Sequence, residues 1–339
     1  MRLSYFLNTE HPADSNLTTR LNEHLEQVQL ARDAGFDGVF IGHHLSYEGA
    51  VWLPPLPTLA RVAAVSGDME LGTCMLLAPL FHPVHLAEQG AMLDIITGGR
   101  FTLGVAPGWS RAESEILGLT HNRRFSRFRE CVEIVQRLWQ GESLSFAGQH
   151  FTLREQSLKL LPIRKPRPPM FFGGSVEAAI QRVATLANPD CGDSWVASSH
   201  VKNERIAIQA RTYRDALDRQ GKTTRSPMPV LRNIVVAPSR KQALKDAGPY
   251  LAASYQAFGQ QGLFRDVIGN ENDQFDLGRL TAGRVILGSP EEVADQLLTL
   301  QESLPYERLI TRVQWMGMEQ RLVLRSIDLL AERVLPALN

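Results

Sequence analysis

Two adjacent histidines, His43 and His44, follow a short apolar run in the stretch FIGHHLSY. Imidazole has an ordinary pKa of about 6.5, so a histidine can donate or accept a proton at neutral pH. The preceding residues 36–41 are typical of a buried strand, and the ends of such strands commonly carry catalytic groups. We therefore treat both histidines as candidates for acid–base chemistry. The alternative is a structural hydrogen-bonded pair in a loop.

The histidine pair gives little support to metal-dependent hydrolysis, and the predicted strand ends give little support to glycoside hydrolysis. On a regular strand, adjacent side chains point to opposite faces, so the two histidines would not converge on one metal ion. No other histidine or carboxylate cluster stands at a predicted strand end. The paired carboxylates of a glycosidase are missing for the same reason. We therefore predict a site without a metal ion.

The remaining predicted strand ends are apolar, aromatic and rich in glycine. They contribute Asn8, Cys74, Met75, Ala106, Trp109, Gly173, Gly174, Ser175 and Trp195. Glycines let the backbone approach an anion, and the first amides of a helix donate to a phosphate. This composition fits a flat aromatic cofactor with a phosphate group, although strand-to-helix turns also use Gly and Ser for geometry alone. The GxGxxG pattern of dinucleotide-binding folds is absent.

Strands and helices alternate along the whole chain. Eight strands are predicted at 2–7, 36–41, 69–78, 100–106, 168–174, 191–198, 228–237 and 308–315. Helical patterns lie between them, among them 18–34, 57–66, 111–140 and 201–219. Pro83 is expected to open a further helix at a first-turn position, and Ser289 is expected to cap another. The pattern predicts an α/β fold, a (β/α)8 TIM barrel with insertions, as one domain over 1–339. A doubly wound sheet is the alternative.

Two segments depart from this alternation. Residues 143–153 are typical of a hairpin insertion, and residues 239–283 are less regular and rich in Gly, Asn, Asp and Gln.

The charge balance and the cysteines indicate which kinds of partner and which cellular compartment to expect. The 339 residues carry 36 basic and 36 acidic side chains, so nothing suggests a nucleic-acid or membrane partner. The opening MRLSYFLNTEHP is broken by polar residues too early for a signal peptide. Three scattered cysteines suit a reducing cytoplasm rather than a disulfide framework. We expect a cytoplasmic protein.

The chain resembles the bacterial-luciferase-like family of flavin-dependent oxidoreductases nearly from end to end. The most specific block has the form HP…LDxxxxGR followed by LGVxxGW within residues 70–109. Further motifs are AGFDGVFIGHHL (34–45), FAGQHFTL (146–153), PPMFFGGS (168–175), LGSPEEVADQL (287–297) and the tail 316–336. The resemblance implies an interrupted (β/α)8 barrel, the same architecture that the alternation predicts. It also implies that residues 239–283 are the variable region before the last helix, which we expect to form a lid over the substrate.

The resemblance also implies roles for individual residues. His43 matches the histidine near the reactive edge of the flavin, and His44 a supporting one. Cys74 and Met75 match a segment that often holds a cis peptide beneath the flavin. The other expected cofactor contacts are Asn8, Ala106, Gly173, Gly174, Ser175 and Trp195, with Trp109 expected at the mouth beside the substrate.

Three positions depart from the pattern of the luciferases themselves. Gly42 stands where they usually have a glutamate, Ala106 replaces a reactive cysteine, and Pro107 replaces an arginine that helps to hold the phosphate. We therefore expect no luciferase-like light emission and a phosphate site that depends on Gly174 and Ser175. A basic cluster forms either a solvated helix face or a surface that steers an anionic cofactor: Arg123, Arg124, Arg127 and Arg129.

These expectations lead to a flavin-dependent monooxygenase that uses reduced, diffusible FMN and O2 to oxidise a small organic substrate. No nicotinamide site is visible, so a separate flavin reductase is a plausible partner, and the resemblance implies a homodimer. One alternative is an F420-dependent hydride-transfer oxidoreductase of the same family. Another is a non-catalytic flavin-binding relative. The sequence does not identify the substrate.

Overall fold

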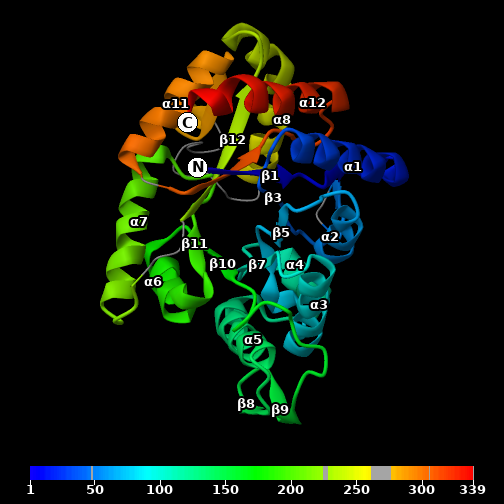
Figure 1. The fold of residues 1–339 in the computed structure, drawn as a ribbon, viewed down its shortest axis with the longest axis vertical. Helices are drawn as coiled ribbons and strands as arrows, with labels where there is room; N and C mark the ends of the chain where they lie inside the picture. Colours follow the sequence, from blue (N-terminus) through cyan, green and yellow to red (C-terminus); the bar gives the residue numbers. More distant parts are fainter. Residues whose placement is uncertain (47–48, 224–227, 261–275, 305, 339) are drawn as a thin grey trace.

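A curled parallel β-sheet forms the centre of the molecule (Figure 1). The computed structural model describes residues 1–46, 49–223, 228–260, 276–304 and 306–338. Nine strands follow one another in the order β11-β10-β7-β5-β3-β1-β14-β12-β13, and short β6 also pairs with β7. Their bounds are β1 Arg2–Leu7, β3 Gly38–Ile41, β5 Glu70–Thr73, β6 Leu76–Leu77, β7 Phe101–Ala106, β10 Met170–Gly173, β11 Ser194–Val196, β12 Pro229–Val236, β13 Val285–Gly288 and β14 Arg308–Arg312.

Helices connect successive strands and cover the outer face of this sheet (Figure 1). The α-helices are α1 Leu17–Asp33, α2 Pro55–Ala63, α3 Pro83–Ile96, α4 Arg111–Ile116, α5 Arg124–Trp139, α6 Glu177–Leu186, α7 Asn203–Asp218, α8 Arg240–Gln260, α10 Leu277–Thr281, α11 Pro290–Ser303 and α12 Gln320–Leu329. Short 3-10 turns lie at η1 Ala78–Leu80, η2 His121–Arg123, η3 Pro189–Cys191 and η5 Leu335–Ala337, and a π turn at Leu330–Val334. Among the described residues no helix is long and apolar enough to cross a membrane.

Local sequence signals explain where several helices begin. The side chain of Ser289 accepts a hydrogen bond from the backbone of Glu292, whose carboxylate returns one to Ser289, so α11 begins with a capping box. Pro83 opens α3 at a first-turn position, where its missing N–H removes no helical hydrogen bond. These predictions of helix starts are confirmed.

The strands bury side chains on both faces. The main hydrophobic core lies between sheet and helices, as the near-continuous apolar strands predict. A second, smaller hydrophobic cluster lies apart from this core. Its six residues come from six different strands of the main sheet or from the residue directly after one: Phe6, Phe40, Cys74, Phe171, Val196 and Ile310. Because successive strand residues point to opposite faces, this cluster marks the inner, concave face of the sheet.

One contact joins the two distant parts of the strand order. Ala197, directly after β11, forms an isolated parallel bridge with Val230 of β12. The amide of Ala197 donates to Pro229 O at 3.1 Å, and the amide of Leu231 donates to Ala197 O at 2.9 Å. Strands β11 and β12 therefore meet through a single residue.

Two short antiparallel sheets lie outside the main sheet. The predicted hairpin is present as β8 Leu144–Ala147 and β9 Thr152–Gln156, and it projects at the lower end of Figure 1. The carboxylate of Glu130 on α5 accepts the amides of three successive residues at its turn, 149–151, at 2.8–3.2 Å. The second sheet was not predicted and pairs β2 Glu10–Pro12 with β4 Ala50–Trp52.

Three details of the predicted element order are wrong. Strand β13 was missed, because its four residues VILG adjoin a strong helix signal. The single helix expected over 111–140 is divided into α4, η2 and α5. Part of the segment expected to be irregular, 239–283, is the regular helix α8, which packs on β12 and β13. Residues 261–275 of the expected lid lie outside the described residues, so its covering role stays a prediction.

Candidate active site

Four predicted site residues come together where β3, β6, β7 and β10 end. Nδ1 of His43 accepts a hydrogen bond from the amide of Leu77 at 3.3 Å. Leu77 pairs with Ala106 across β6 and β7. A methyl carbon placed on Gly173 would lie 3.2 Å from Cβ of Ala106 and 3.1 Å from Cγ of Met75. The structure therefore brings the strand ends that carry His43, Met75, Ala106 and Gly173 close together.

The peptide bond between Cys74 and Met75 is cis, as expected from the resemblance. Cys74 belongs to the apolar cluster of the inner face, and Met75 packs against the same cluster. Burial raises the pKa of the Cys74 thiol to about 12, so the thiol stays protonated near neutral pH. Cys74 is therefore an apolar side chain of the inner face and not an activated nucleophile; its contact with the cofactor stays a prediction.

His43 is a neutral hydrogen-bonding group in this environment. Its side chain is 9% exposed, and burial lowers its pKa to about 4, with the neighbouring His44 acting in the same direction and Glu113 opposing. Because Nδ1 accepts from Leu77, the ring proton of the neutral form is on Nε2. His43 therefore presents an N–H donor at neutral pH and carries no charge.

His44 turns to different neighbours. Its Nδ1 lies 2.9 Å from Oε1 of Glu113, and the amide of Leu45 donates to the same oxygen at 2.8 Å. The ring lies edge-on to Trp52 and to Trp109, with centroids 4.7 and 6.1 Å away. The predicted substrate residue Trp109 thus adjoins His44.

Glu113 was not predicted as a site residue. It is buried in the first turn of α4, and it supplies a carboxylate to the histidine pair. The motif WSRAESE contains two glutamates, and nothing in the sequence distinguishes the buried Glu113 from the exposed Glu115. Only the spatial contact with His44 identifies it.

Gly42 leaves room for two aromatic rings. A methyl carbon placed on Gly42 would lie 3.1 Å from Cζ of Phe6 and 3.3 Å from Cζ3 of Trp52. A glutamate, which luciferases usually have at this position, would displace these rings. The carboxylate beside the histidines therefore comes from Glu113 in this chain.

The Gly-Gly-Ser turn is held from behind by Trp195. The indole Nε1 donates to Gly174 O at 2.8 Å, and the carbonyl of Ser175 accepts from Gln209 at 2.6 Å. Trp195 is fully buried and packs against Tyr213, on the opposite face of β11 from Val196 of the inner cluster. In this structure Trp195 supports the turn; a direct contact with the cofactor stays a prediction.

The start of α6 has free donors beside this turn. The N-cap residue Val176 supplies no side-chain hydrogen bond, and Ser175 is exposed next to it. Exposed backbone amides at a helix start, together with a hydroxyl, are suited to an anion such as a phosphate. The predicted phosphate role of Gly174 and Ser175 is therefore compatible with the geometry.

The basic cluster divides into two pairs. Arg123 and Arg129 are exposed, as a solvated helix face predicts. Arg124 instead donates to Gly108 O at 3.2 Å, and Arg127 to Pro79 O at 2.8 Å. These two arginines therefore hold loops at the ends of β7 and β6.

The β1 side of the site is polar and buried. Asn8 is fully buried, and its Oδ1 has no hydrogen-bond partner among the residues that the structure describes. Glu10 lies 3.3 Å from Arg312, and burial raises the pKa of Glu10 against the opposing effect of this arginine. The cofactor role of Asn8 stays a prediction.

Together these features fit a flat aromatic cofactor with a phosphate. The inner cluster provides an apolar floor, and Gly173 provides space that a side chain would fill. The start of α6 provides donors for an anion. No group of three or more potential metal ligands is found in the described part of the chain.

The sequence matches the family described as luciferase-like monooxygenase over residues 1–307. Among curated relatives, the oxygenase component of the flavin-dependent trigonelline monooxygenase from Acinetobacter baylyi is 25% identical, over 100% of this chain and 96% of that protein. F420-dependent enzymes also occur among the similar proteins.

Two solved structures share the fold. Monooxygenase RslO1 from Streptomyces bottropensis has a TM-score of 0.84 at 22% identity, covering 99% of each chain. The oxygenating constituent of 3,6-diketocamphane monooxygenase from Pseudomonas putida, in complex with FMN, has a TM-score of 0.81 at 17% identity, covering 100% of this chain and 99% of that one. At these identities the similarity establishes the fold alone.

Proposed function

Because the chain belongs to the luciferase-like monooxygenase family, we propose that it is a flavin-dependent monooxygenase that oxidises a small organic substrate with reduced FMN and O2. The observation that carries this proposal is the neutral His43: its Nδ1 accepts from Leu77, which pairs with Ala106, so its ring proton is on Nε2. Reduced FMN, when bound, supplies the electrons that activate dioxygen.

The residues of this chain would bind and orient the reactants. Gly174, Ser175 and the first amides of α6 would hold the phosphate, and the inner apolar cluster would seat the ring. His43 would donate a hydrogen bond from Nε2 to a reacting oxygen without adding a charge. Asn8 offers a further polar contact from β1.

His44 would act from the substrate side of the site. Its Nδ1 would donate to Glu113, and its ring lies beside Trp109 and Trp52. Glu113 would thereby fix the orientation of the His44 ring beside the substrate. The aromatic rings would exclude water around them.

Several finer features belong to the same proposal. The relative's description as an oxygenase component supports a separate flavin reductase for this enzyme. Three free, buried cysteines suit a reducing cytoplasm. The Ala197–Val230 bridge supports closure of the sheet into a (β/α)8 barrel within one domain.

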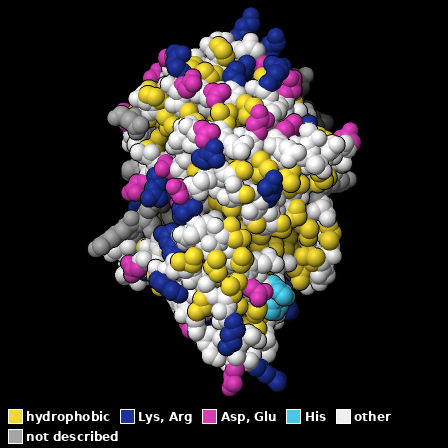
Figure 2. Space-filling view, turned by 45° about the vertical axis from the view of Figure 1, so that its right-hand side comes forward, with side chains coloured by type: hydrophobic (Ala, Val, Ile, Leu, Met, Phe, Trp, Pro, Cys, Tyr) yellow, Lys and Arg dark blue, Asp and Glu magenta, His cyan; other side chains and the backbone are white. Residues whose placement is uncertain are grey.

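A homodimer is proposed through the face that carries α2–α4. Figure 2 shows hydrophobic side chains gathered on this face, and the strongly exposed ones include Met92, Ile96, Ile116 and Leu117. An apolar patch of this kind is a common interface between copies. Light scattering of the wild type and of Ile96→Glu tests it: a dimer that the substitution dissociates is expected, and a monomeric wild type would contradict it.

The F420-dependent hydride transferase remains the second candidate, because F420-dependent enzymes occur among the similar proteins. A titration of the purified protein with FMN and F420, each oxidised and reduced, separates the two. We expect preferential binding of reduced FMN and substrate-dependent oxygen consumption. A preference for F420 would overturn the monooxygenase proposal. Saturable flavin binding without turnover of any substrate would support the non-catalytic relative.

A further inference from the structure

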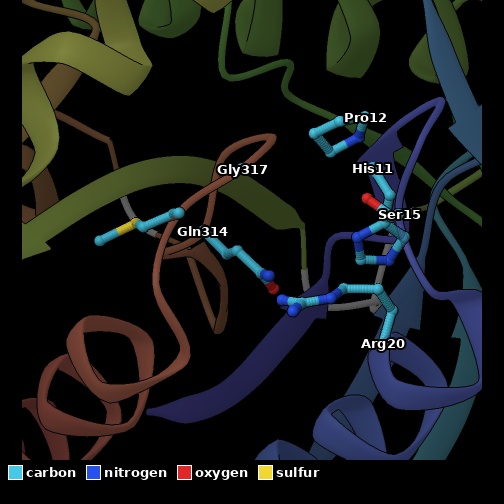
Figure 3. A pocket seen from close by; sticks show the side chains of 7 residues that line it. His11, Pro12, Ser15, Arg20, Gln314 and Gly317 are labelled. Atoms are coloured by element: carbon cyan, nitrogen blue, oxygen red, sulfur yellow. The ribbon is translucent and has the colours of Figure 1, made fainter.

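A separate pocket lies between the β1–α1 connection, α1 and the segment after β14 (Figure 3). Its volume is about 210 Å³, and its lining comprises His11, Pro12, Ser15, Arg20, Gln314, Gly317 and Met318. A water molecule occupies about 30 Å³ of liquid, so the space equals that of about seven waters. This is enough for a small organic molecule and much less than a flavin requires.

The pocket is separated from the proposed flavin site by strand β2. Glu10 on β2 pairs with Trp52 on β4, so their side chains lie on the same face of this small sheet. On that face Glu10 contacts Arg312, and Trp52 contacts His44. The next residue, His11, points to the opposite face, toward His24 of α1. None of the predicted flavin or substrate residues lines this pocket.

A directional hydrogen-bond network determines the proton position on His11. The amide nitrogen of Gln27 donates to Gln320 at 2.7 Å, so its Oε1 accepts from Tyr5 at 2.9 Å and from Nδ1 of His24 at 3.3 Å. Nε2 of a neutral His24 is then an acceptor, and Nε2 of His11 donates to it at 2.9 Å. Nδ1 of His11 is consequently an acceptor on the ring that lines the pocket.

Gln314 adds a second acceptor. Its side chain is 4% exposed, and its Oε1 has no hydrogen-bond partner within the described ranges. A buried carbonyl oxygen without a donor destabilises the free protein, so a ligand that donates to it would be favoured. Figure 3 shows the side chain of Arg20 extending toward that of Gln314, with the ring of His11 beside them.

Arg20 supplies the charge. One of its terminal nitrogens pairs with Glu23 at 2.6 Å, and the guanidinium retains further donors for an anion. A carboxylate matches the planar fork of a guanidinium, which can donate to both of its oxygens. A ligand ammonium group would be repelled by Arg20, whereas a hydroxyl would satisfy an acceptor without that cost.

We propose that this pocket binds a small 2-hydroxycarboxylate, with its carboxylate on Arg20 and its hydroxyl donated to Gln314 or His11. Pro12 and Met318 provide the apolar wall for a short carbon chain. This site is additional to the proposed monooxygenase function and does not depend on it.

Methyl-labelled methionine NMR provides the test, because Met318 lines the pocket and Met318→Leu assigns its signal. Glycolate is the probe, and acetate and glycine are matched analogues that lack the hydroxyl or carry an ammonium in its place. We expect glycolate to shift the Met318 methyl saturably and to bind about tenfold more tightly than acetate, the effect of one good hydrogen bond. Glycine is expected to bind more weakly than glycolate.

Two variants locate the binding. Arg20→Gln and Gln314→Glu are expected to abolish the glycolate shift, the second by repelling the carboxylate. Arg333→Gln, which breaks an exposed pair with Glu291 far from the pocket, is the matched control and should bind like the wild type. An unshifted Met318 methyl in the wild type would overturn the proposal, as would equal binding by Arg20→Gln or equal affinities for glycolate and acetate. FMN titration of the same samples reports separately on the flavin site.

Discussion

Nδ1 of His44 and Oε1 of Glu113 lie 2.9 Å apart in space and 69 residues apart in the chain. The same carboxylate oxygen accepts the amide of Leu45 at 2.8 Å, so Glu113 fixes both the imidazole and the backbone that follows it. The loop after β3 is thereby attached to the helix after β7. The orientation of the second histidine thus depends on a residue from another βα unit.

Removing this carboxylate should destabilise the protein. We expect Glu113→Ala to lower the free energy of unfolding by about 2–3 kcal/mol, because two buried donors lose a charged acceptor. Urea unfolding measures the change. Glu115→Ala is the matched control, since Glu115 lies on the same helix, is exposed and pairs only with Arg111 at 3.5 Å in the described structure. Equal stability of the two variants would show that the contact with His44 contributes nothing.

Replacing His43 should reduce turnover without preventing flavin binding. We expect His43→Ala to lower kcat by about 10²–10⁴-fold once a substrate is known, as loss of a positioned proton donor does. Stopped-flow oxidation of reduced FMN measures the step before a substrate is found. His150→Ala, which removes a histidine bonded to Ser126 at 2.7 Å, should leave the rate unchanged. A His43 variant with normal kinetics would reduce this residue to a structural role.

Introducing the glutamate that luciferases usually have should disturb the site. We expect Gly42→Glu to lower the free energy of unfolding by about 1–3 kcal/mol, because the rings of Phe6 and Trp52 occupy the space of a side chain. Gly42→Ala should have a smaller effect of the same sign. Thermal and urea unfolding measure both. If Gly42→Glu is as stable as the wild type, the rings have more freedom than the structure indicates.

Acid should weaken the fold through a buried histidine pair. Burial lowers the pKa of His11 to about 3, with His24 and Arg20 adding to the effect, and burial lowers that of His24 to about 4. Both values lie below the unfolded value of about 6.5, so between these limits the unfolded chain binds more protons. The stability is therefore complete above about pH 6.5 and decreases as the pH falls toward about 4.

Urea unfolding at several pH values checks this direction. Each histidine adds a slope of up to about 1.4 kcal/mol per pH unit in that window. The variant His24→Gln should be less stable at neutral pH and should show a shallower decrease on acidification. A slope unchanged by this substitution would show that the pair does not titrate as described.

The sequence was sufficient for most of the element order because its signals are local. Apolar runs, Pro83 and the Ser289 cap predicted strands and helix starts that the structure contains. Strand β13 was not predicted, because four apolar residues directly before a helix are too few to show a strand periodicity. Helix α8 was not predicted, because the Gly and Pro residues within it weaken the helical signal. The burial of Ala243, Ala247 and Leu251 against the rest of the protein stabilises it.

The candidate site was predictable only where strand order determines position. The ends of β7 and β10 adjoin, so Ala106 and Gly173 had to lie close together. Glu113 and the pocket around Arg20 involve side chains that meet through the packing of loops and helices. The sequence also could not predict which face of the sheet Trp195 lies on, because a fully buried strand is apolar on both faces.

The single bridge between Ala197 and Val230 has a consequence for local opening. Strand β12 pairs with β14 through five residue positions but meets β11 through one. Backbone amides at such a junction are released by small fluctuations, without global unfolding. In deuterated water, the amides of Ala197 and Leu231 should therefore exchange earlier than those shared by β1 and β14. The sheet should separate first along this line, next to the turn that carries Gly174 and Ser175.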